Sequence, residues 1–211
     1  MMTTIMLIRH GDTDWNVEEI FRGRVDVELN ETGIKQAKLL SEYLEDVPIK
    51  AIYSSPLKRA FKTAKTISES HDIEVMAARE LIDFDYGEWQ GLSHDMVREK
   101  HKALYDEWSN NPQLVKMPKG ESLDDVRRRA ISLVDQVITN HEGTVALVSH
   151  RVIHKVMICA LLGLDNSHFW NIRLDTCGIT TFTHEDKRFV LVRHNDTSFL
   201  KPIARATLSD F

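Results

Sequence analysis

The sequence has few of the features that mark secreted, disulfide-stabilised or membrane proteins. Only two of its 211 residues are cysteines, Cys159 and Cys177, and both lie in apolar stretches. We therefore expect two reduced thiols rather than a disulfide framework. No apolar run approaches the roughly 18 residues that a membrane span requires. The first residues lack a basic segment followed by an apolar signal stretch, so we expect a cytoplasmic protein with no membrane partner.

Positive charge is also scarce, because the formal net charge is -5 at pH 7. A general nucleic-acid binder is usually basic, so we expect no nucleic-acid partner. The apolar share of 42% and the charged share of 28% are typical of a soluble globular protein. The length suits one domain with a substantial core. Since no repeat or linker divides the chain, we expect a single domain over residues 1–211.

Strand and helix patterns alternate along most of the chain. An apolar strand at residues 5–8 precedes a helical pattern at about 31–45, which Asn30 can cap. Similar patterns predict strands near 50–53 and 144–148 and one within 73–84, helices at 56–70, 93–109, 122–138 and 153–162, and a hairpin at 178–195. This alternation predicts an α/β fold, a three-layer α/β/α sandwich with a mainly parallel central sheet. Residues about 85–120 interrupt the alternation, and we expect them to form a helical cap insertion.

Three of the predicted strands end in residues that suit phosphate chemistry. The stretches are Arg9-His10-Gly11, Ser54-Ser55-Pro56 followed by Arg59, and Ser149-His150-Arg151. The carboxyl ends of parallel strands share one edge of a sheet, where ligands bind, so these side chains should meet. Arginine forks fit phosphate oxygens, and a neutral imidazole can attack phosphorus to form a phosphohistidine. Phosphoryl transfer needs mainly such an in-line nucleophile and surrounding positive charge.

The same chemistry needs a proton donor for the leaving group. The stretch "ELIDFDYGEW" offers four candidates, which are Glu80, Asp83, Asp85 and Glu88. No metal is required, although the two histidines and Asp83 could hold one; no HExxH, CxxC or HxH spacing supports that alternative. Each residue taken alone also has a purely structural explanation. Their convergence at one predicted edge favours a phosphoryl-transfer site.

Six segments, in order along nearly the whole chain, resemble the histidine phosphatase superfamily in its phosphoglycerate mutase-like branch. They are "LIRHGDTDWN", "FRGRVDVELNETGIKQA", "IYSSPLKRAFKTA", "LIDFDYGEWQG", "VALVSHR" and "DTCGITTF". The resemblance implies that His10 is the nucleophile that becomes phosphorylated, with Arg9, Arg59 and His150 around the phosphate. It implies a proton donor at Asp83. Four further binding positions follow from the same resemblance: Asn16 as a phosphate contact, Thr13 in the pocket wall, and Arg22 and Gly23 in a loop that lines the substrate.

The sequence departs from the family pattern at two positions. The usual acid is glutamate, but Asp83 is one methylene shorter, so that a water or Glu80 could assist it. Arg151 follows the second histidine, where glycine is usual. We assign Arg151 to recognition of substrate charge, with a position facing solvent as the alternative.

These residues support a phosphatase that hydrolyses a small phosphorylated metabolite without a metal or other cofactor. A cofactor-dependent phosphoglycerate mutase is the first alternative, but residues 85–120 contain no adjacent arginine pair of the kind such mutases carry. A catalytically weak protein that binds phosphorylated ligands is the second.

Several residues outside the predicted site carry structural predictions. We expect Trp89, Trp108 and Tyr105 to anchor the cap rather than line the substrate pocket. We place the run "RRR" at 127–129 on a solvated basic face. His154 and Lys155 should lie behind the site or at the surface. The hairpin at residues 179–194 could offer an edge strand for a homodimer.

Overall fold

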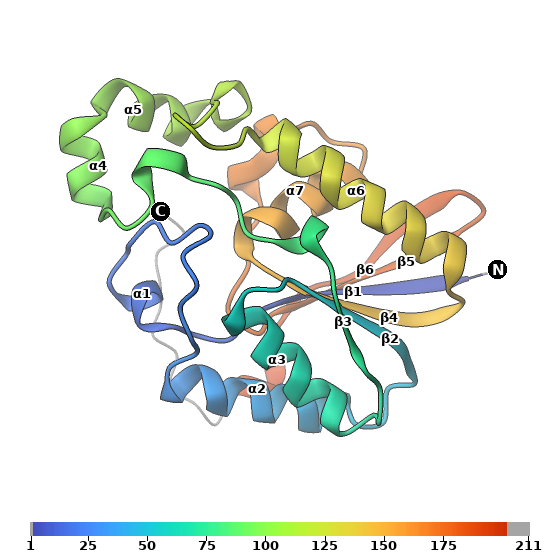
Figure 1. Cartoon of the computed structure of the whole chain (residues 1–211). Helices are drawn as coiled ribbons and strands as arrows, with labels where there is room; N and C mark the ends of the chain where they lie inside the picture. Colours follow the sequence, from blue (N-terminus) through green and yellow to red (C-terminus); the bar gives the residue numbers. More distant parts are fainter. Residues whose placement is uncertain (1, 202–211) are drawn as a thin grey trace.

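The computed structural model describes residues 2–201 and places a single mixed sheet at the centre of the molecule (Figure 1). The strands are β1 (Thr3–Arg9), β2 (Ile49–Ser54), β3 (Val75–Ala77), β4 (Gly143–Ser149), β5 (Ile179–Glu185) and β6 (Arg188–Asp196). Their order across the sheet is β3-β2-β4-β1-β5-β6. The first four in chain order run parallel, and β5 and β6 form an antiparallel hairpin at one side. The mainly parallel sheet and the hairpin are confirmed.

Helices cover both faces of this sheet, which confirms the three-layer architecture (Figure 1). The α-helices are α1 (Asp14–Val17), α2 (Glu31–Leu44), α3 (Lys58–Glu69), α4 (His94–Lys100), α5 (Lys102–Asn110), α6 (Leu123–Asn140) and α7 (Arg151–Leu161). Short 3₁₀ turns are η1 (Arg79–Leu81), η2 (Gly87–Trp89), η3 (Pro112–Leu114), η4 (Asn166–Asn171) and η5 (Ser198–Leu200). Helices α2 and α3 pack on one face of the sheet, and α6 and α7 on the other.

The central residues of β1, Ile5 to Ile8, are all apolar, in keeping with the burial of both faces of this strand. Successive side chains of a strand point to opposite faces. Ile5 and Leu7 accordingly join the core beneath α6 and α7, whereas Met6 and Ile8 join the core against α2 and α3. This double burial fixes β1 in the middle of the sheet and brings its carboxyl end, with Arg9, to the edge where the site forms.

Helices α2 and α6 begin where the sequence supplies capping side chains. Asn30 precedes α2, and its side-chain oxygen accepts a hydrogen bond from the Gly33 amide at 2.9 Å. Ser122 precedes α6 and forms a capping box with Asp125. Both helix starts agree with the predicted ones, because capping is a local property of the chain.

The cap segment differs from the prediction in detail. One helix was expected over residues 93–109, but the chain forms α4 and α5, separated at His101, whose backbone leaves the helical region. Trp89 and Trp108 are buried in the core that α6 and α7 share with the cap. Trp108 stacks on Phe84 with ring centroids 5.5 Å apart. The two tryptophans therefore anchor the cap, as predicted.

The solvated face expected for residues 127–129 was wrong for Arg129, and the surface alternative for Lys155 does not hold. Arg129 does not lie on a solvated face, because only 18% of its side chain is exposed, whereas that of Arg128 is 76% exposed. Lys155 is fully buried, with its ammonium 5.1 Å from the centroid of the Phe169 ring. His154 is also buried, and its Nε2 donates to the Ile8 carbonyl at 3.0 Å, directly behind the site. In these cases a tertiary neighbour covers a residue that its own helix would leave exposed.

Two further features concern the whole described chain. Cys159 and Cys177 are buried free thiols, as expected. Among residues 2–201, no helix has both the length and the apolar composition that spanning a membrane requires.

Candidate active site

The carboxyl ends of β1, β2 and β4 bring the predicted residues together at one edge of the sheet. His10 follows β1, His150 follows β4, and Arg59 lies in the first turn of α3, which follows β2. The His10 and His150 rings lie with their centroids 5.1 Å apart. All three side chains are buried. The convergence expected from parallel strands is confirmed.

The His10 ring is held in one tautomer. Its Nδ1 lies 2.6 Å from the Gly11 carbonyl oxygen, which can only accept, so Nδ1 carries the proton and Nε2 the lone pair. Nε2 is buried and has no hydrogen-bond partner among the described residues. Burial, followed by the positive charges of Arg59, Arg22 and Arg9, holds the pKa of His10 well below its usual value. The ring is therefore neutral at pH 7 with an available nucleophilic nitrogen.

The loop after β1 is fixed by a close approach to α2. A Cβ atom on Gly11 would lie 2.6 Å from the Gly33 carbonyl oxygen, so a side chain at position 11 would collide with the backbone of α2. Gln36 accepts from the Asp12 amide and donates to the Asp12 carboxylate, both at 2.8 Å. No role was predicted for Gln36 from the sequence. Gln36 could have been identified from its place in the "TGIKQA" segment. It lies a turn and a half into the helix that follows the histidine loop.

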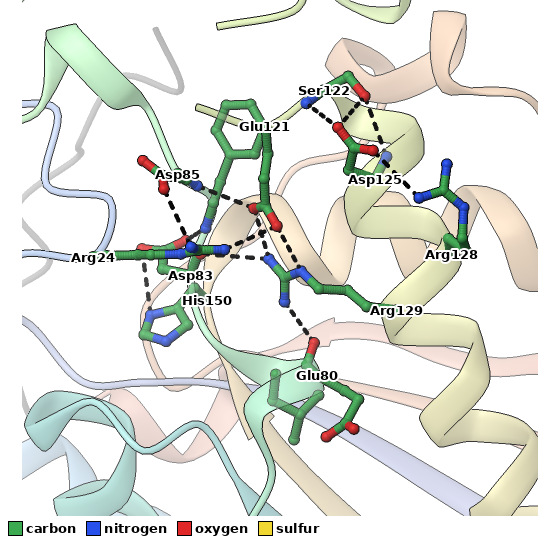
Figure 2. A network of polar contacts seen from close by, with 12 residues as sticks. Arg24, Glu80, Asp83, Asp85, Glu121, Ser122, Asp125, Arg128, Arg129 and His150 are labelled. Atoms are coloured by element: carbon green, nitrogen blue, oxygen red, sulfur yellow. Dashed lines mark hydrogen bonds and ion pairs between the residues drawn. The ribbon is translucent and has the colours of Figure 1, made fainter. Parts of the chain in front are cut away.

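The second histidine connects the phosphate pocket to the candidate acid. The Ser55 hydroxyl lies 2.8 Å from His150 Nε2. On the other side of the ring, Nδ1 lies 3.4 Å from the Asp83 carboxylate, a contact that Figure 2 shows. His150 is also the residue that precedes α7, so the first amides of that helix point toward the site and favour an anion there. Burial, Arg59 and His10 lower the pKa of His150 well below its usual value, so this ring is also neutral.

Of the four candidate carboxylates, Asp83 is the one at the histidine pair. Its Oδ2 accepts from Arg59 at 2.8 Å, and its Oδ1 accepts from the Phe84 amide at 2.8 Å. Asp85 pairs with Arg24 instead. The other two do not reach the histidines: Glu88 pairs with Lys119 at the surface, and the Glu80 carboxylate points away from Asp83 in Figure 2.

Arg9 is braced from the turn before β5. It is buried, and its Nη1 donates to the Leu174 carbonyl at 2.5 Å. The Cys177 amide donates to the carbonyls of Arg9 and His10 at 3.1 and 3.3 Å. The "DTCG" turn thus fixes the backbone of the first arginine and histidine.

The remaining loop residues form the rim of the pocket. Arg22 donates to the Thr13 hydroxyl at 2.8 Å, and that hydroxyl donates to the Asn16 side-chain oxygen at 2.9 Å. The Gly23 carbonyl accepts from Arg59 at 2.8 Å. Burial and the neighbouring Arg59 and Arg9 lower the pKa of Arg22 to about 9, so its guanidinium still carries charge at neutral pH.

Arg151 faces a small pocket beside these residues. It shares the pocket with Arg22, Asp83, Tyr86 and His94, among others, and the pocket volume of about 30 Å³ has room for one small group. Burial raises the pKa of Tyr86 to about 12 and lowers that of His94 to about 4, so both side chains are neutral at pH 7. Arg151 is half-buried and lines this pocket, so its role in recognition of substrate charge stays a prediction.

Comparison with known proteins agrees with this geometry. The sequence pattern of the histidine phosphatase superfamily (branch 1) matches residues 5–197. The chain belongs to the histidine phosphatase superfamily. It is 37% identical over 200 residues to phosphoserine phosphatase 1 from Hydrogenobacter thermophilus, covering 94% of this chain and 95% of the relative. It is 28% identical over 207 residues to a metal-independent phosphoserine phosphatase from Arabidopsis thaliana, covering 96% and 85%.

A solved structure shows the same fold. The Bacillus stearothermophilus protein YhfR superimposes with a TM-score of 0.90 at 31% identity. The match covers 94% of this chain and 100% of YhfR. This histidine phosphatase is therefore an enzyme that hydrolyses phosphate esters. Residues 2–201 contain no cluster of three or more His, Cys, Asp or Glu side chains arranged to hold a metal ion.

Proposed function

We propose that this histidine phosphatase hydrolyses a small phosphomonoester through a phosphohistidine at His10, without a metal. The observation that carries the proposal is the state of His10 Nε2. That nitrogen is buried, neutral and without a hydrogen-bond partner in the described part of the chain, and three arginines lie close enough to lower the pKa of its ring. Such an atom suits in-line attack on phosphorus, since the positive charges stabilise the equatorial oxygens.

The first step forms a bond between His10 Nε2 and phosphorus and breaks the bond from phosphorus to the ester oxygen. Asp83, in its protonated form, gives its proton to that leaving oxygen. In the second step Asp83 takes a proton from water, and the water oxygen attacks phosphorus. The bond to His10 breaks, inorganic phosphate leaves, and both residues return to their starting forms.

We assign the phosphate oxygens to Arg9, Arg59 and His150, together with the first amides of α7. Arg59 is well suited because it already contacts Asp83 at 2.8 Å, so one guanidinium can connect the transferred phosphoryl group with the acid. Asn16 reaches the phosphate through Thr13, and Gly23 orients Arg59 through its carbonyl.

For the substrate we propose a phosphomonoester that also bears a carboxylate, with phosphoserine as the first candidate. Arg22 and Arg151 both line the small pocket next to Asp83, and two guanidiniums there favour a second anionic group. The Hydrogenobacter relative is named as a phosphoserine phosphatase. A mutase is the weaker proposal because residues 85–120 lack an adjacent arginine pair.

The test is phosphate release from a panel of esters that includes phosphoserine, phosphoethanolamine and p-nitrophenyl phosphate. The wild type and His10→Ala are compared, each with and without a chelator. We expect release that is unaffected by the chelator, fastest with phosphoserine, and at least about a thousandfold slower in His10→Ala, as for loss of a covalent nucleophile. The wild type, quenched during turnover of ³²P-labelled substrate, should carry acid-labile, alkali-stable label.

Each part of the proposal can fail separately. A folded His10→Ala variant with near-normal release would exclude the phosphohistidine step. Inactivation by the chelator would restore the metal site. Equal rates on phosphoserine and phosphoethanolamine would remove the carboxylate from the recognised substrate. Phosphate binding without turnover of any ester would indicate a binding protein.

A further inference from the structure

Four charged side chains form a network around the loop that carries Asp83 (Figure 2). Arg129 of α6 contacts both carboxylate oxygens of Glu121, each at 3.1 Å. Arg24 reaches Glu121 at 2.8 Å and the Asp85 carboxylate at 3.1 Å. The members come from the loop after α1, from the Asp83 loop, from the end of the cap segment and from α6. Glu121 is the residue that joins the two arginines.

Both arginines also donate to the main chain of the Asp83 loop. Arg129 donates to the Glu80 carbonyl at 2.6 Å and, more weakly, to the Asp83 carbonyl at 3.4 Å. Arg24 donates to the same Asp83 carbonyl at 3.3 Å. The Asp83 carbonyl oxygen therefore lies between two guanidinium groups. The Glu121 carboxylate accepts from the Asp85 amide at 3.1 Å and holds the loop on its far side.

The network is partly buried, and solvent screens it less than a surface ion pair. The exposed fraction of the side chain is 18% for Arg129, 16% for Glu121 and 35% for Arg24. Arg128, the residue of α6 that precedes Arg129, is 76% exposed and pairs with Asp125. The two neighbouring arginines thus have the same chemistry but different surroundings, which makes Arg128 a matched control.

We propose that Arg24 and Arg129, joined through Glu121, are positioning residues for the proton donor. They fix the backbone at Asp83 so that its short side chain reaches the leaving-group oxygen. This inference rests on the proposed function, in which Asp83 is that donor.

The length of the side chain gives the physical reason. An aspartate carboxyl is separated from its backbone by a single methylene, so a shift of the backbone moves the carboxyl by nearly the same amount. A misplacement of about 1 Å can reduce a rate by a hundredfold. The network anchors the backbone, while Arg59 and the Phe84 amide orient the carboxylate. Anchoring of the backbone matters most when the acid is aspartate, because its side chain is short.

The experiment compares Arg129→Met, Arg129→Lys, Arg24→Met and Arg128→Met on two substrates. Phosphoserine has a poor alkoxide leaving group that needs the acid, and p-nitrophenyl phosphate has a good one that does not. We expect kcat/KM, which reports formation of the phosphohistidine and not its hydrolysis, to fall about tenfold or more on phosphoserine in Arg129→Met and Arg24→Met. On p-nitrophenyl phosphate it should stay within about twofold to threefold. Arg128→Met should match the wild type on both.

Thermal unfolding shows whether each variant folds, and Asp83→Asn tests the proton donor itself. Arg129→Lys keeps the charge but loses the fork, so it provides a second variant if Arg129→Met does not fold, and it should show a smaller loss on phosphoserine. Equal losses on both substrates in folded variants, or no loss on either, would overturn the positioning role. If Asp83→Asn slows both reactions equally, Asp83 is not the proton donor and the proposed function fails instead. If Asp83→Asn slows the phosphoserine reaction more than the p-nitrophenyl phosphate reaction but the arginine variants do not, only the positioning role is refuted.

Discussion

The reactivity proposed for His10 depends on which of its two nitrogens carries the proton. The Gly11 carbonyl fixes that proton on Nδ1, and three nearby arginines together with burial keep the ring neutral. A protonated ring would have no lone pair for phosphorus. The Gly11 carbonyl therefore selects the tautomer, and burial with the three cations outweighs the rise in pKa that its hydrogen bond causes.

Arg151 is the residue whose side chain we expect to decide selectivity. Replacing it with glutamine removes one of the two cations that line the small pocket while keeping a polar side chain of similar length. We expect Arg151→Gln to raise KM for phosphoserine by about tenfold, as for loss of one charged hydrogen bond. The kinetic constants for p-nitrophenyl phosphate, which lacks a carboxylate, should stay within about twofold. A similar change on both substrates would assign Arg151 to the transferred phosphoryl group.

Among the secondary-structure elements, the contact between the β1 loop and α2 carries the most consequence for the site. Gly33 is in the first turn of α2, where alanine is ordinarily more favourable than glycine. Here a Cβ atom would lie 2.1 Å from the Asp12 carbonyl oxygen. The steric overlap must displace the loop that follows His10.

We therefore expect Gly33→Ala to lower the free energy of unfolding by about 1–3 kcal/mol despite the gain in helix propensity. The activity should fall as well, because Asp12 and Thr13 move with the loop. Urea unfolding and phosphate release measure the two effects. Lys35→Ala, at an exposed position of the same helix, should change the free energy of unfolding by less than about 0.5 kcal/mol. A stabilised Gly33→Ala variant would contradict the close approach.

Element boundaries show where the sequence was informative. The starts of α2 and α6 followed from Asn30 and Ser122, because a cap bonds to an amide three residues away. The break at His101 did not follow, since the residues on both sides favour a helix. The cap helices are instead separated at His101, whose ring lies beside the buried Trp89 with centroids 6.2 Å apart.

At the scale of the whole molecule, buried histidines connect stability to pH. His10, His150 and His154 are all buried, and desolvation is the largest cause that lowers each pKa, to about 4 for His154. In the unfolded chain their pKa values return to about 6.5. Below that pH the unfolded state binds more protons than the folded state, so the free energy of unfolding must decrease as the pH falls.

We expect full stability from this source above pH 6.5 and a progressive loss as the pH falls from 6.5 toward about 4, the folded value for His154. Each histidine can contribute a slope of up to about 1.4 kcal/mol per pH unit. Urea unfolding at pH 7, 6 and 5 measures this dependence. His154→Gln, which can still donate to the Ile8 carbonyl, should make the slope shallower. A free energy of unfolding that stays constant from pH 7 to 5 would show that these rings are accessible to protons.

The sequence by itself determined the alternation of strands and helices, the parallel sheet and the edge at which His10, Arg59 and His150 meet. Those properties follow from periodicity, capping and strand direction, which act over a few residues. Only the tertiary structure decided which of the four carboxylates reaches the histidines, that Arg151 faces a pocket, that Arg129 is half-buried and that Lys155 is buried. Each of these depends on contacts between residues far apart in the chain, such as Glu121 with Arg24, and local patterns do not record such contacts.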